Sequence, residues 1–224
     1  TLHNTLFPYT TLFRSPGSPF SSNFLVSWTE LLMSLPRNNI IPMLSSKRSS
    51  NVYFVRNLCL GGNVLGGIDQ RPFGGQQDYD YIMWIDSDVV FRPEHFYQLL
   101  SHEEDIVSGI YMMENGRQFA VVEDWDEKHF LEHGTFHFLD SDDMQKRKAP
   151  FPVAYTGMGF MLVKKGVFES IGYPWCRPVN YEFSEEVKDF SSEDAGFCHV
   201  ARAKGFSVLV DPSVRVGHEK ALIL

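Results

Sequence analysis

Apolar residues along this chain recur with two different periods, and the two periods alternate. Between residues 23 and 35 they stand three or four positions apart, which is the spacing of one helix face, and Pro36 ends the run. Residues 81–85 are instead continuously apolar and rich in Ile and aromatic side chains, which is typical of a strand buried on both faces. Helices and strands that alternate in this way predict an α/β fold with a mainly parallel sheet flanked by helices.

The same patterns predict most of the remaining elements. We expect helices over residues 51–60, 93–101, 164–171 and 193–204, and strands over residues 40–44, 105–111, 153–163, 206–210 and 214–216. Shorter strands are expected over residues 121–122 and 135–138, and a solvated loop over residues 141–148. No apolar run approaches the ~20 residues that a membrane span needs, so no membrane span is predicted.

The composition is that of a globular protein and limits its partners. The 224 residues suffice for one domain with a substantial core, and 43% of them are hydrophobic. The formal net charge of −8 argues against non-specific binding of nucleic acid. Three cysteines without metal-type spacing fit a reducing compartment, so we expect a soluble cytoplasmic protein, in the host cytoplasm if its source is viral.

The first residues are treated separately from the rest of the chain. Residues 5–15 resemble the in-frame translation of a common sequencing-adapter oligonucleotide, and an ordinary short N-terminal segment is the alternative. We therefore exclude residues 1–15 from fold reasoning as an artefactual tail. The rest, residues 16–224, is expected to form a single domain.

Two carboxylates follow the apolar strand at residues 81–85 directly. Asp86 and Asp88 stand one residue apart, with the small Ser87 between them. Ligands of open α/β sheets bind at the carboxyl ends of strands. Two acids there are costly unless a positive group lies against them, and Mg²⁺ or Mn²⁺ carrying phosphates meets that need. A solvated turn explains most isolated Asp-x-Asp patterns, but the strand before this one and the helix after it favour a metal site.

Two further groups of polar residues could belong to the same site. Glu193 and Asp194 follow Ser192 at a predicted helix start, where either capping alone explains them or one carboxylate serves as a general base. His218 follows a short predicted strand and is either structural or an extra metal ligand, especially for Mn²⁺.

Two short motifs complete the set. Residues 156–159 read Thr-Gly-Met-Gly, which indicates either a bulge or a close approach of the backbone to a ligand. Arg56 and Asn57 lie on the predicted helix at residues 51–60, as surface polar residues or as contacts to a nucleotide base or phosphate.

In their order and spacing, these pieces resemble the GT-A glycosyltransferases over roughly residues 24–219. The pieces are the Arg-Asn helix, the apolar strand into Asp-x-Asp, Asp-Ile-Val-Ser-Gly-Ile-Tyr at residues 105–111, Thr-Gly-Met-Gly-Phe at residues 156–160, Ser-Glu-Asp at residues 192–194 and a late His. The chain is most similar to the small soluble enzymes of this kind in viruses and bacteria. The resemblance implies a Rossmann-like GT-A fold and metal-dependent, inverting transfer of a sugar from a nucleoside-diphosphate sugar to a glycan or other hydroxyl acceptor.

The resemblance also implies roles on the donor side. Asp86, Ser87 and Asp88 would hold the donor diphosphate. Asp88, Asp86 and His218 would bind the Mn²⁺ or Mg²⁺ ion, with Asp88 the main ligand and Asp86 also close to a sugar or ribose. The family opens with a strand and loop that hold the nucleotide base. Adapter-like residues take that place here, so the domain is expected to lack its first strand.

Further roles follow for the rest of the site. Arg56 and Asn57 would lie near the nucleotide. Asp194 would be the general base, with Glu193 as the fallback. The acceptor side would be lined by Thr156, Gly157 and Met158.

Other interpretations stay open at this stage. Haloacid-dehalogenase-like phosphohydrolases also have an apolar strand that leads into Asp-x-Asp, but it is their first strand, and here two helices and a strand precede it. A nucleotidyltransferase could use the same metal chemistry. A non-catalytic nucleotide-sugar-binding remnant is the third alternative: the intact acids and His218 argue against it, and the missing first strand argues for it.

Overall fold

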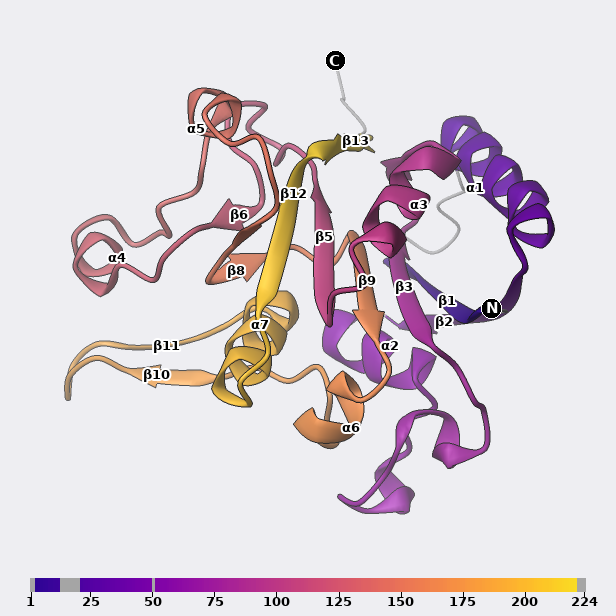
Figure 1. Cartoon of the computed structure of the whole chain (residues 1–224). Coiled ribbons are helices and arrows are strands. Elements are labelled where there is room, and N and C mark those ends of the chain that lie inside the picture. Colours follow the sequence, from indigo (N-terminus) through magenta and orange to yellow (C-terminus); the bar gives the residue numbers. More distant parts are fainter. Residues whose placement is uncertain (1–2, 13–20, 50, 221–224) are drawn as a thin grey trace.

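The computed structural model describes residues 3–12, 21–49 and 51–220, and a seven-stranded mixed sheet forms its centre (Figure 1). The strand order is β2–β1–β3–β9–β5–β12–β7. The bounds are β1 His3–Leu12, β2 Ile40–Ser49, β3 Tyr81–Asp86, β5 Ile106–Ile110, β7 Phe151–Pro152, β9 Phe160–Lys164 and β12 Val208–Arg215. Five strands run in one direction, and β9 and β7 run against them. The α/β class with flanking helices is therefore confirmed, with β9 inserted as an antiparallel strand between β3 and β5.

Helices cover both faces of the sheet. Helices α1 (Ser22–Ser34) and α3 (Pro93–Ser101) pack on one face, and α2 (Val52–Cys59), α6 (Val167–Ile171) and α7 (Glu193–Ala203) pack on the other (Figure 1). Strand β3 shows why, because its side chains alternate between two hydrophobic cores, one on each face of the sheet. Met83 and Ile85 point into the core under α1 and α3, and Ile82 and Trp84 point into the core under α2, α6 and α7. The continuous apolar run thus predicted a strand buried on both faces correctly.

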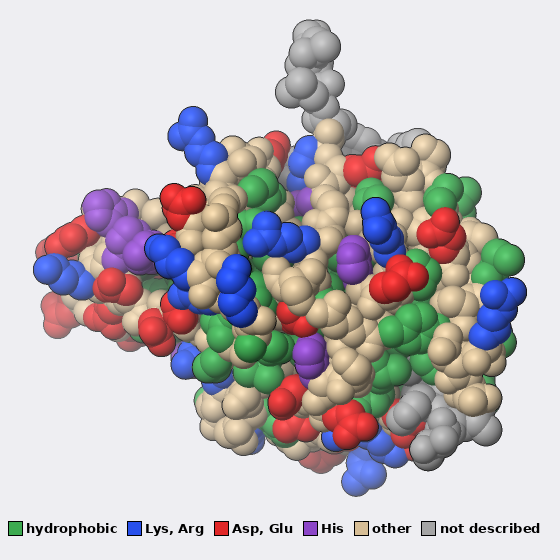
Figure 2. Space-filling model, turned by 45° about the horizontal axis from the view of Figure 1, so that its top comes forward, with side chains coloured by type: hydrophobic (Ala, Val, Ile, Leu, Met, Phe, Trp, Pro, Cys, Tyr) green, Lys and Arg blue, Asp and Glu red, His purple; other side chains and the backbone are tan. Residues whose placement is uncertain are grey.

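A second group of short elements forms a lobe beside the sheet (Figure 1). It contains β6 (Val121–Val122), β8 (Tyr155–Thr156), α4 (Glu127–His133), α5 (Ser141–Gln145) and the hairpin of β10 (Asn180–Glu182) and β11 (Lys188–Phe190). The rings of His129, His133 and His137 gather on this lobe, at the left of Figure 2. The helices are short and each begins at an aspartate cap, Asp126 and Asp140. Their lack of an apolar stripe explains why periodicity missed them.

Three predicted segments differ from the structure. Residues 135–138 form no strand, because the rings of Phe136 and Phe138 pack on Tyr155 instead of standing on a ladder. The two strands expected over residues 206–216 are one strand, β12. Pro212 lies within it, and its pairing with β5 shifts register between Val210 and Arg215. Residues 141–148, expected as a loop, begin with α5.

A strand occupies the place where the sequence predicted that the first strand would be missing. Residues 3–12 form β1, which lies between β2 and β3 and runs parallel to both. Threonine and aromatic residues dominate the segment, and both types favour extended backbone. The adapter-like origin of this segment stays a prediction, and its residues 13–15 lie outside the described residues.

Two short strands and three single turns complete the structure. Strands β4 (Val89–Val90) and β13 (Gly217–His218) pair with each other beyond the carboxyl edge of the sheet. The 3₁₀ turns span Leu35–Asn38, Val64–Gly66 and Pro72–Gly75. No helix of the described ranges has both the length and the apolar character needed to cross a membrane.

One buried carboxylate joins α3 to β12 on the side of the sheet that α3 covers. Asp211 is 2% exposed and accepts hydrogen bonds from Gln98 Nε2 at 3.0 Å, from Ser213 N at 2.9 Å and from His102 Nε2 at 2.8 Å. Burial raises its pKa, but Ser213 and then His102 more than offset this and lower the pKa below its usual range.

We expect Asp211→Asn to lose about 1–3 kcal/mol of unfolding free energy at neutral pH, because an amide replaces an ionised acceptor of several hydrogen bonds. The pKa of Asp211 is lower in the folded than in the unfolded protein. The stabilisation is therefore present above the unfolded pKa of about 3.9 and disappears as the pH falls through the lower pKa of the folded protein. Urea unfolding of the parent and of Asp211→Asn should therefore show a difference in unfolding free energy at about pH 7, and this difference should shrink toward about pH 3. The exposed Asp69→Asn is the control. A difference in unfolding free energy that does not change with pH would contradict the stabilising role of the ionised Asp211 carboxylate.

Candidate active site

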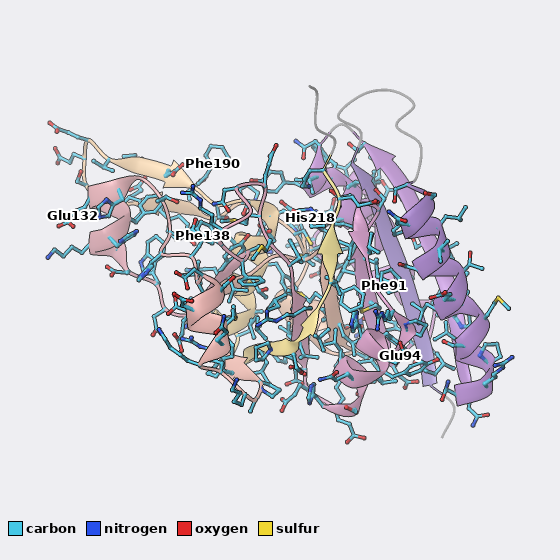
Figure 3. The ribbon with its side chains drawn as sticks, turned by 90° about the horizontal axis from the view of Figure 1, so that it is seen from above. Phe91, Glu94, Glu132, Phe138, Phe190 and His218 are labelled. Atoms are coloured by element: carbon cyan, nitrogen blue, oxygen red, sulfur yellow. The ribbon has the colours of Figure 1, made fainter. Side chains whose placement is uncertain are left out.

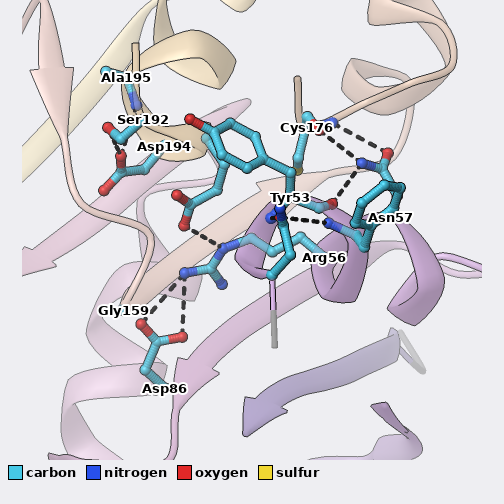
Figure 4. A network of polar contacts seen from close by, with 12 residues as sticks. Tyr53, Arg56, Asn57, Asp86, Gly159, Cys176, Ser192, Asp194 and Ala195 are labelled. Carbon is cyan, nitrogen blue, oxygen red and sulfur yellow. Dashed lines mark hydrogen bonds and ion pairs between the residues drawn. The ribbon is translucent and has the colours of Figure 1, made fainter. Parts of the chain in front are cut away.

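A buried arginine lies at the centre of the polar network in Figure 4. Arg56 projects from α2, which begins after its cap residue Asn51, and is 2% exposed. Its Nη2 lies 3.2 Å from Oδ1 and 3.3 Å from Oδ2 of Asp86, and its Nε donates to Glu193 Oε1 at 3.1 Å. Its guanidinium carbon lies 5.3 Å from the centroid of the Trp84 ring. Arg56 therefore joins α2, the end of β3 and the start of α7.

Two carboxylates keep this guanidinium charged. Burial lowers the pKa of Arg56, but Asp86 and then Glu193 more than offset burial and hold the pKa above its usual value. Burial and the charge of Asp194 raise the pKa of Glu193, and its ion pair with Arg56 opposes that rise. Arg56 and Glu193 are thus bound to each other, and the nucleotide contact expected for Arg56 and the fallback base role of Glu193 stay predictions.

Asn57, the neighbour of Arg56, has a structural role. Its amide nitrogen donates to the carbonyl oxygens of Cys176 at 2.6 Å and of Tyr53 at 2.7 Å. Its Oδ1 accepts a hydrogen bond from Cys176 N at 3.3 Å. These contacts anchor the segment before β10 to α2 (Figure 4). The expected nucleotide contact of Asn57 is corrected accordingly, because both polar ends of its side chain bind backbone.

Asp88 meets two cationic or potentially cationic side chains from the end of the chain. His218 Nε2 lies 3.2 Å and Lys220 Nζ lies 2.7 Å from its Oδ2. Burial raises the pKa of Asp88, but His218 and Lys220 more than offset this and lower it to about 2. The pairing of β13 with β4, in which His218 lies opposite Val89, brings these segments together. The prediction that His218 lies beside Asp88 is confirmed.

The orientation of His218 suits a metal ligand. Its Nδ1 lies 3.0 Å from the Met112 carbonyl oxygen, which can only accept, so Nδ1 carries a proton and Nε2 points to Asp88. Metal-binding histidines usually have this outer hydrogen bond. Burial lowers the pKa of His218, but the hydrogen bond and charge of Asp88 more than offset that and raise it. Seen from above, His218 lies between Phe138 on the lobe and Phe91 in the segment between β4 and α3 (Figure 3).

The three-residue metal cluster expected from the sequence is not present. No group of three or more His, Cys, Asp or Glu residues within the described ranges is arranged to hold a metal ion. Asp86 does not join Asp88 and His218, because Arg56 binds its carboxylate. Ser87, between the two acids, is half-buried. Two protein ligands still fit Mg²⁺ or Mn²⁺, which commonly keep waters and substrate phosphates in their remaining positions.

Asp194 lies on the first turn of α7 and is held by three donors. Its Oδ1 accepts hydrogen bonds from Ala195 N at 2.8 Å and from the Ser192 hydroxyl, and its Oδ2 accepts one from Tyr155 Oη at 3.0 Å. Ser192 occupies the cap position without capping the helix through its side chain, contrary to our expectation. Its hydroxyl instead orients Asp194 (Figure 4). A carboxylate offers about four lone-pair sites, so Oδ2 retains one for an incoming hydroxyl.

The glycines at residues 157 and 159 make room for a side chain of this chain rather than for a ligand. A Cβ on Gly157 would lie 2.0 Å from Tyr111 Oη, and one on Gly159 would lie 2.9 Å from the Tyr111 ring. Tyr111 Oη accepts a hydrogen bond from Gly159 N at 3.2 Å, and its ring packs on His218 with centroids 4.9 Å apart. Burial, and then the charges of Asp86 and Asp194, raise the pKa of Tyr111, so its hydroxyl stays protonated.

The packing of Tyr111 also bears on the residues that were expected to line the acceptor side. Met158 is fully buried in the core, and Thr156 is 1% exposed. Tyr111 fills the space above Gly157. Sequence reasoning assigned no role to Tyr111 or to Tyr155. Tyr111 is the last residue of the predicted strand 105–111 and Tyr155 lies near the start of the predicted strand 153–163, and these positions at strand ends were the available signal.

We expect Gly157→Ala to cost about 1–3 kcal/mol of unfolding free energy, because the new methyl group would collide with the buried Tyr111 hydroxyl. Chemical denaturation measures the loss. In the Tyr111→Phe background the same substitution should cost clearly less, since the colliding oxygen is gone. Equal costs in the two backgrounds would show that Tyr111 does not fill this slot.

Comparisons with known proteins identify the fold. No family model and no curated protein sequence matches the chain. The crystal structure of A197 from STIV matches with a TM-score of 0.50 and 18% identity, over 99% of this chain and 96% of A197. That of GalNAc-T7 with UDP, GalNAc and Mn²⁺ matches with a TM-score of 0.53 and 11% identity, over 99% of this chain and 44% of GalNAc-T7, so this chain spans less than half of that protein. The chain thus has the α/β fold of the GT-A glycosyltransferases.

Proposed function

We propose that this chain is a metal-dependent glycosyltransferase that transfers a sugar from a nucleoside-diphosphate sugar to an acceptor hydroxyl, with inversion at the anomeric carbon. The observation that carries the proposal is the Asp88–His218 pair at the carboxyl end of β3, with an oriented Asp194 at the start of α7, which Arg56 joins to the end of β3. Tyr111 interacts with both groups: its ring packs on His218, and the charge of Asp194 contributes to raising the pKa of its hydroxyl.

The charged side chains at Asp88 indicate how the donor would be bound. Asp88 and His218 would hold a divalent cation that, when bound, neutralises the charge of the diphosphate leaving group. Lys220, 2.7 Å from Asp88, adds a positive charge that can move to a phosphate oxygen when the cation takes the carboxylate. GalNAc-T7 was crystallised with UDP and Mn²⁺, so UDP sugars are the first donors to test.

The acceptor side follows from Asp194. A single displacement requires that the attacking hydroxyl lose its proton to a carboxylate within hydrogen-bond reach. Tyr155, Ala195 and Ser192 fix the carboxylate of Asp194 and leave part of Oδ2 available for that proton. Glu193, bound to Arg56, does not compete for this role.

We expect Asp88→Asn to lose Mn²⁺-dependent donor binding, because an amide is a poor ligand for a hard cation. Thermal unfolding is measured with a panel of nucleoside-diphosphate sugars, with and without Mn²⁺. A donor present at a hundredfold excess over its Kd adds about 2.7 kcal/mol to the stability of the parent. Asp78→Asn, an exposed aspartate paired with Lys165, is the control and should keep the full shift. A Mn²⁺-dependent shift that survives in Asp88→Asn would refute the metal role of Asp88.

We expect Asp194→Asn to lower turnover by about 10²–10⁴-fold while donor affinity stays near that of the parent, since a general base acts on the acceptor alone. Steady-state transfer, with the donor identified by the panel, measures the effect. Ser192→Ala is the matched variant: it removes one of three hydrogen bonds to Asp194 and should lose far less. Retention of the donor's anomeric configuration, read from the product by NMR, or full activity of Asp194→Asn would contradict the role.

A further inference from the structure

An aromatic cavity lies between the lobe and α7, next to Asp194. Its volume is about 210 Å³. The residues on which the argument depends are Trp125, Phe136, Tyr155, Tyr181, His199 and Arg202. Neither the donor side of the site nor the main core of the protein uses this space.

The cavity wall is a continuous aromatic surface. The rings of Trp125 and Tyr181 stack with centroids 5.7 Å apart and planes 14° apart, and Phe136 stacks on Tyr155 with centroids 5.8 Å apart and planes 25° apart. Trp125 is 37% exposed, although aromatic side chains of this size are mostly buried when they serve only packing. Ring faces carry a negative quadrupole and attract weakly positive hydrogens.

The polar groups of the cavity lie at defined places. Tyr155 forms part of the wall, and its hydroxyl donates to Asp194 at 3.0 Å, so a ligand on this wall lies close to the proposed base. His199 and Arg202 follow on the same helix as Asp194, and the hydroxyl of Tyr181 lies 3.4 Å from His199 Nδ1. A suitable ligand therefore combines an apolar face with hydroxyl groups around its edge.

We propose that this cavity is the acceptor site and that its occupant is one pyranose ring of a glycan, stacked on the wall of Trp125 and Tyr181. The proposal rests on the proposed transferase function. The C–H hydrogens of a sugar face meet the aromatic rings, and its hydroxyls meet His199, Arg202 and Asp194. A dry cavity of about 150 Å³ holds a benzene ring, so a cavity of about 210 Å³ accommodates one substituted six-membered ring. A serine or threonine side chain would leave most of the wall uncovered.

Tryptophan fluorescence gives a direct test. Trp28, Trp84 and Trp175 are at most 9% exposed, so a sugar that contacts tryptophan reports on Trp125. Methyl glycosides of glucose, galactose, mannose and N-acetylglucosamine are titrated with UDP and Mn²⁺ present and again without them. We expect at least one glycoside to change the fluorescence saturably. Trp125→Phe should remove most of the change, and Trp125→Ala should weaken binding at least tenfold, measured by saturation-transfer NMR.

Phe190→Ala is the matched control, because Phe190 is a 63% exposed aromatic residue on the same hairpin as Tyr181 and does not line the cavity (Figure 3). It should bind the glycoside as the parent does. Binding of no glycoside, binding of benzyl alcohol in place of every glycoside, or binding unaffected by both Trp125→Ala and Tyr181→Ala would overturn the inference.

The donor panel separates this inference from the proposed function. If donors bind with Mn²⁺ and no glycoside binds, the cavity assignment alone is wrong. If a glycoside binds the cavity and no donor binds under any condition, the transferase proposal fails and, with it, the acceptor role of the bound sugar.

Discussion

The ion-pair network of Arg56 is the constraint on which the rest of the site depends. A buried guanidinium is tolerated only when carboxylates compensate it, and breaking such a pair leaves an uncompensated charge in the interior. Arg56 takes one acid from each of two motifs: Asp86 from the end of β3 and Glu193 from the start of α7. The other acid of each motif, Asp88 or Asp194, is then placed by the backbone and points elsewhere. Each motif thus contains one acid that binds Arg56 and one that does not.

This division removes a conflict that the sequence presents. Asp86 and Asp88, read alone, are like charges one residue apart, which need a shared cation. In the structure each has its own cationic partner, because Arg56 binds Asp86 while His218 and Lys220 bind Asp88. Cationic side chains of the chain itself therefore face both carboxylates. A divalent cation would exchange with Lys220 on Asp88 and need not neutralise a strained acid pair.

The sequence predicted those features that local pattern determines. Periodicity and turn chemistry predicted the buried strand β3, the helices α1, α3 and α7, and the place of Asp88 next to a strand end. The place of His218 beside the site was instead implied by the family resemblance. Periodicity does not encode which distant residue will occupy a space. The contacts of Arg56 with Glu193, of Asn57 with Cys176 and of Tyr111 with Gly157 each join residues more than 40 positions apart in the chain. The short lobe helices lack the apolar stripe that would identify them.

Tyr111 packs against both the donor side of the site and the segment between β8 and β9. Its ring contacts His218 on the donor side, and its hydroxyl fills the notch of Gly157 and Gly159 in the segment that leads from β8 to β9. Tyr155, which binds Asp194, belongs to the same β8 strand. Protein interiors transmit small shifts because they are close-packed. Tyr111 thus packs between the His218 ring and the segment that leads to Tyr155, so its side chain is the packing link between the proposed donor and acceptor sides.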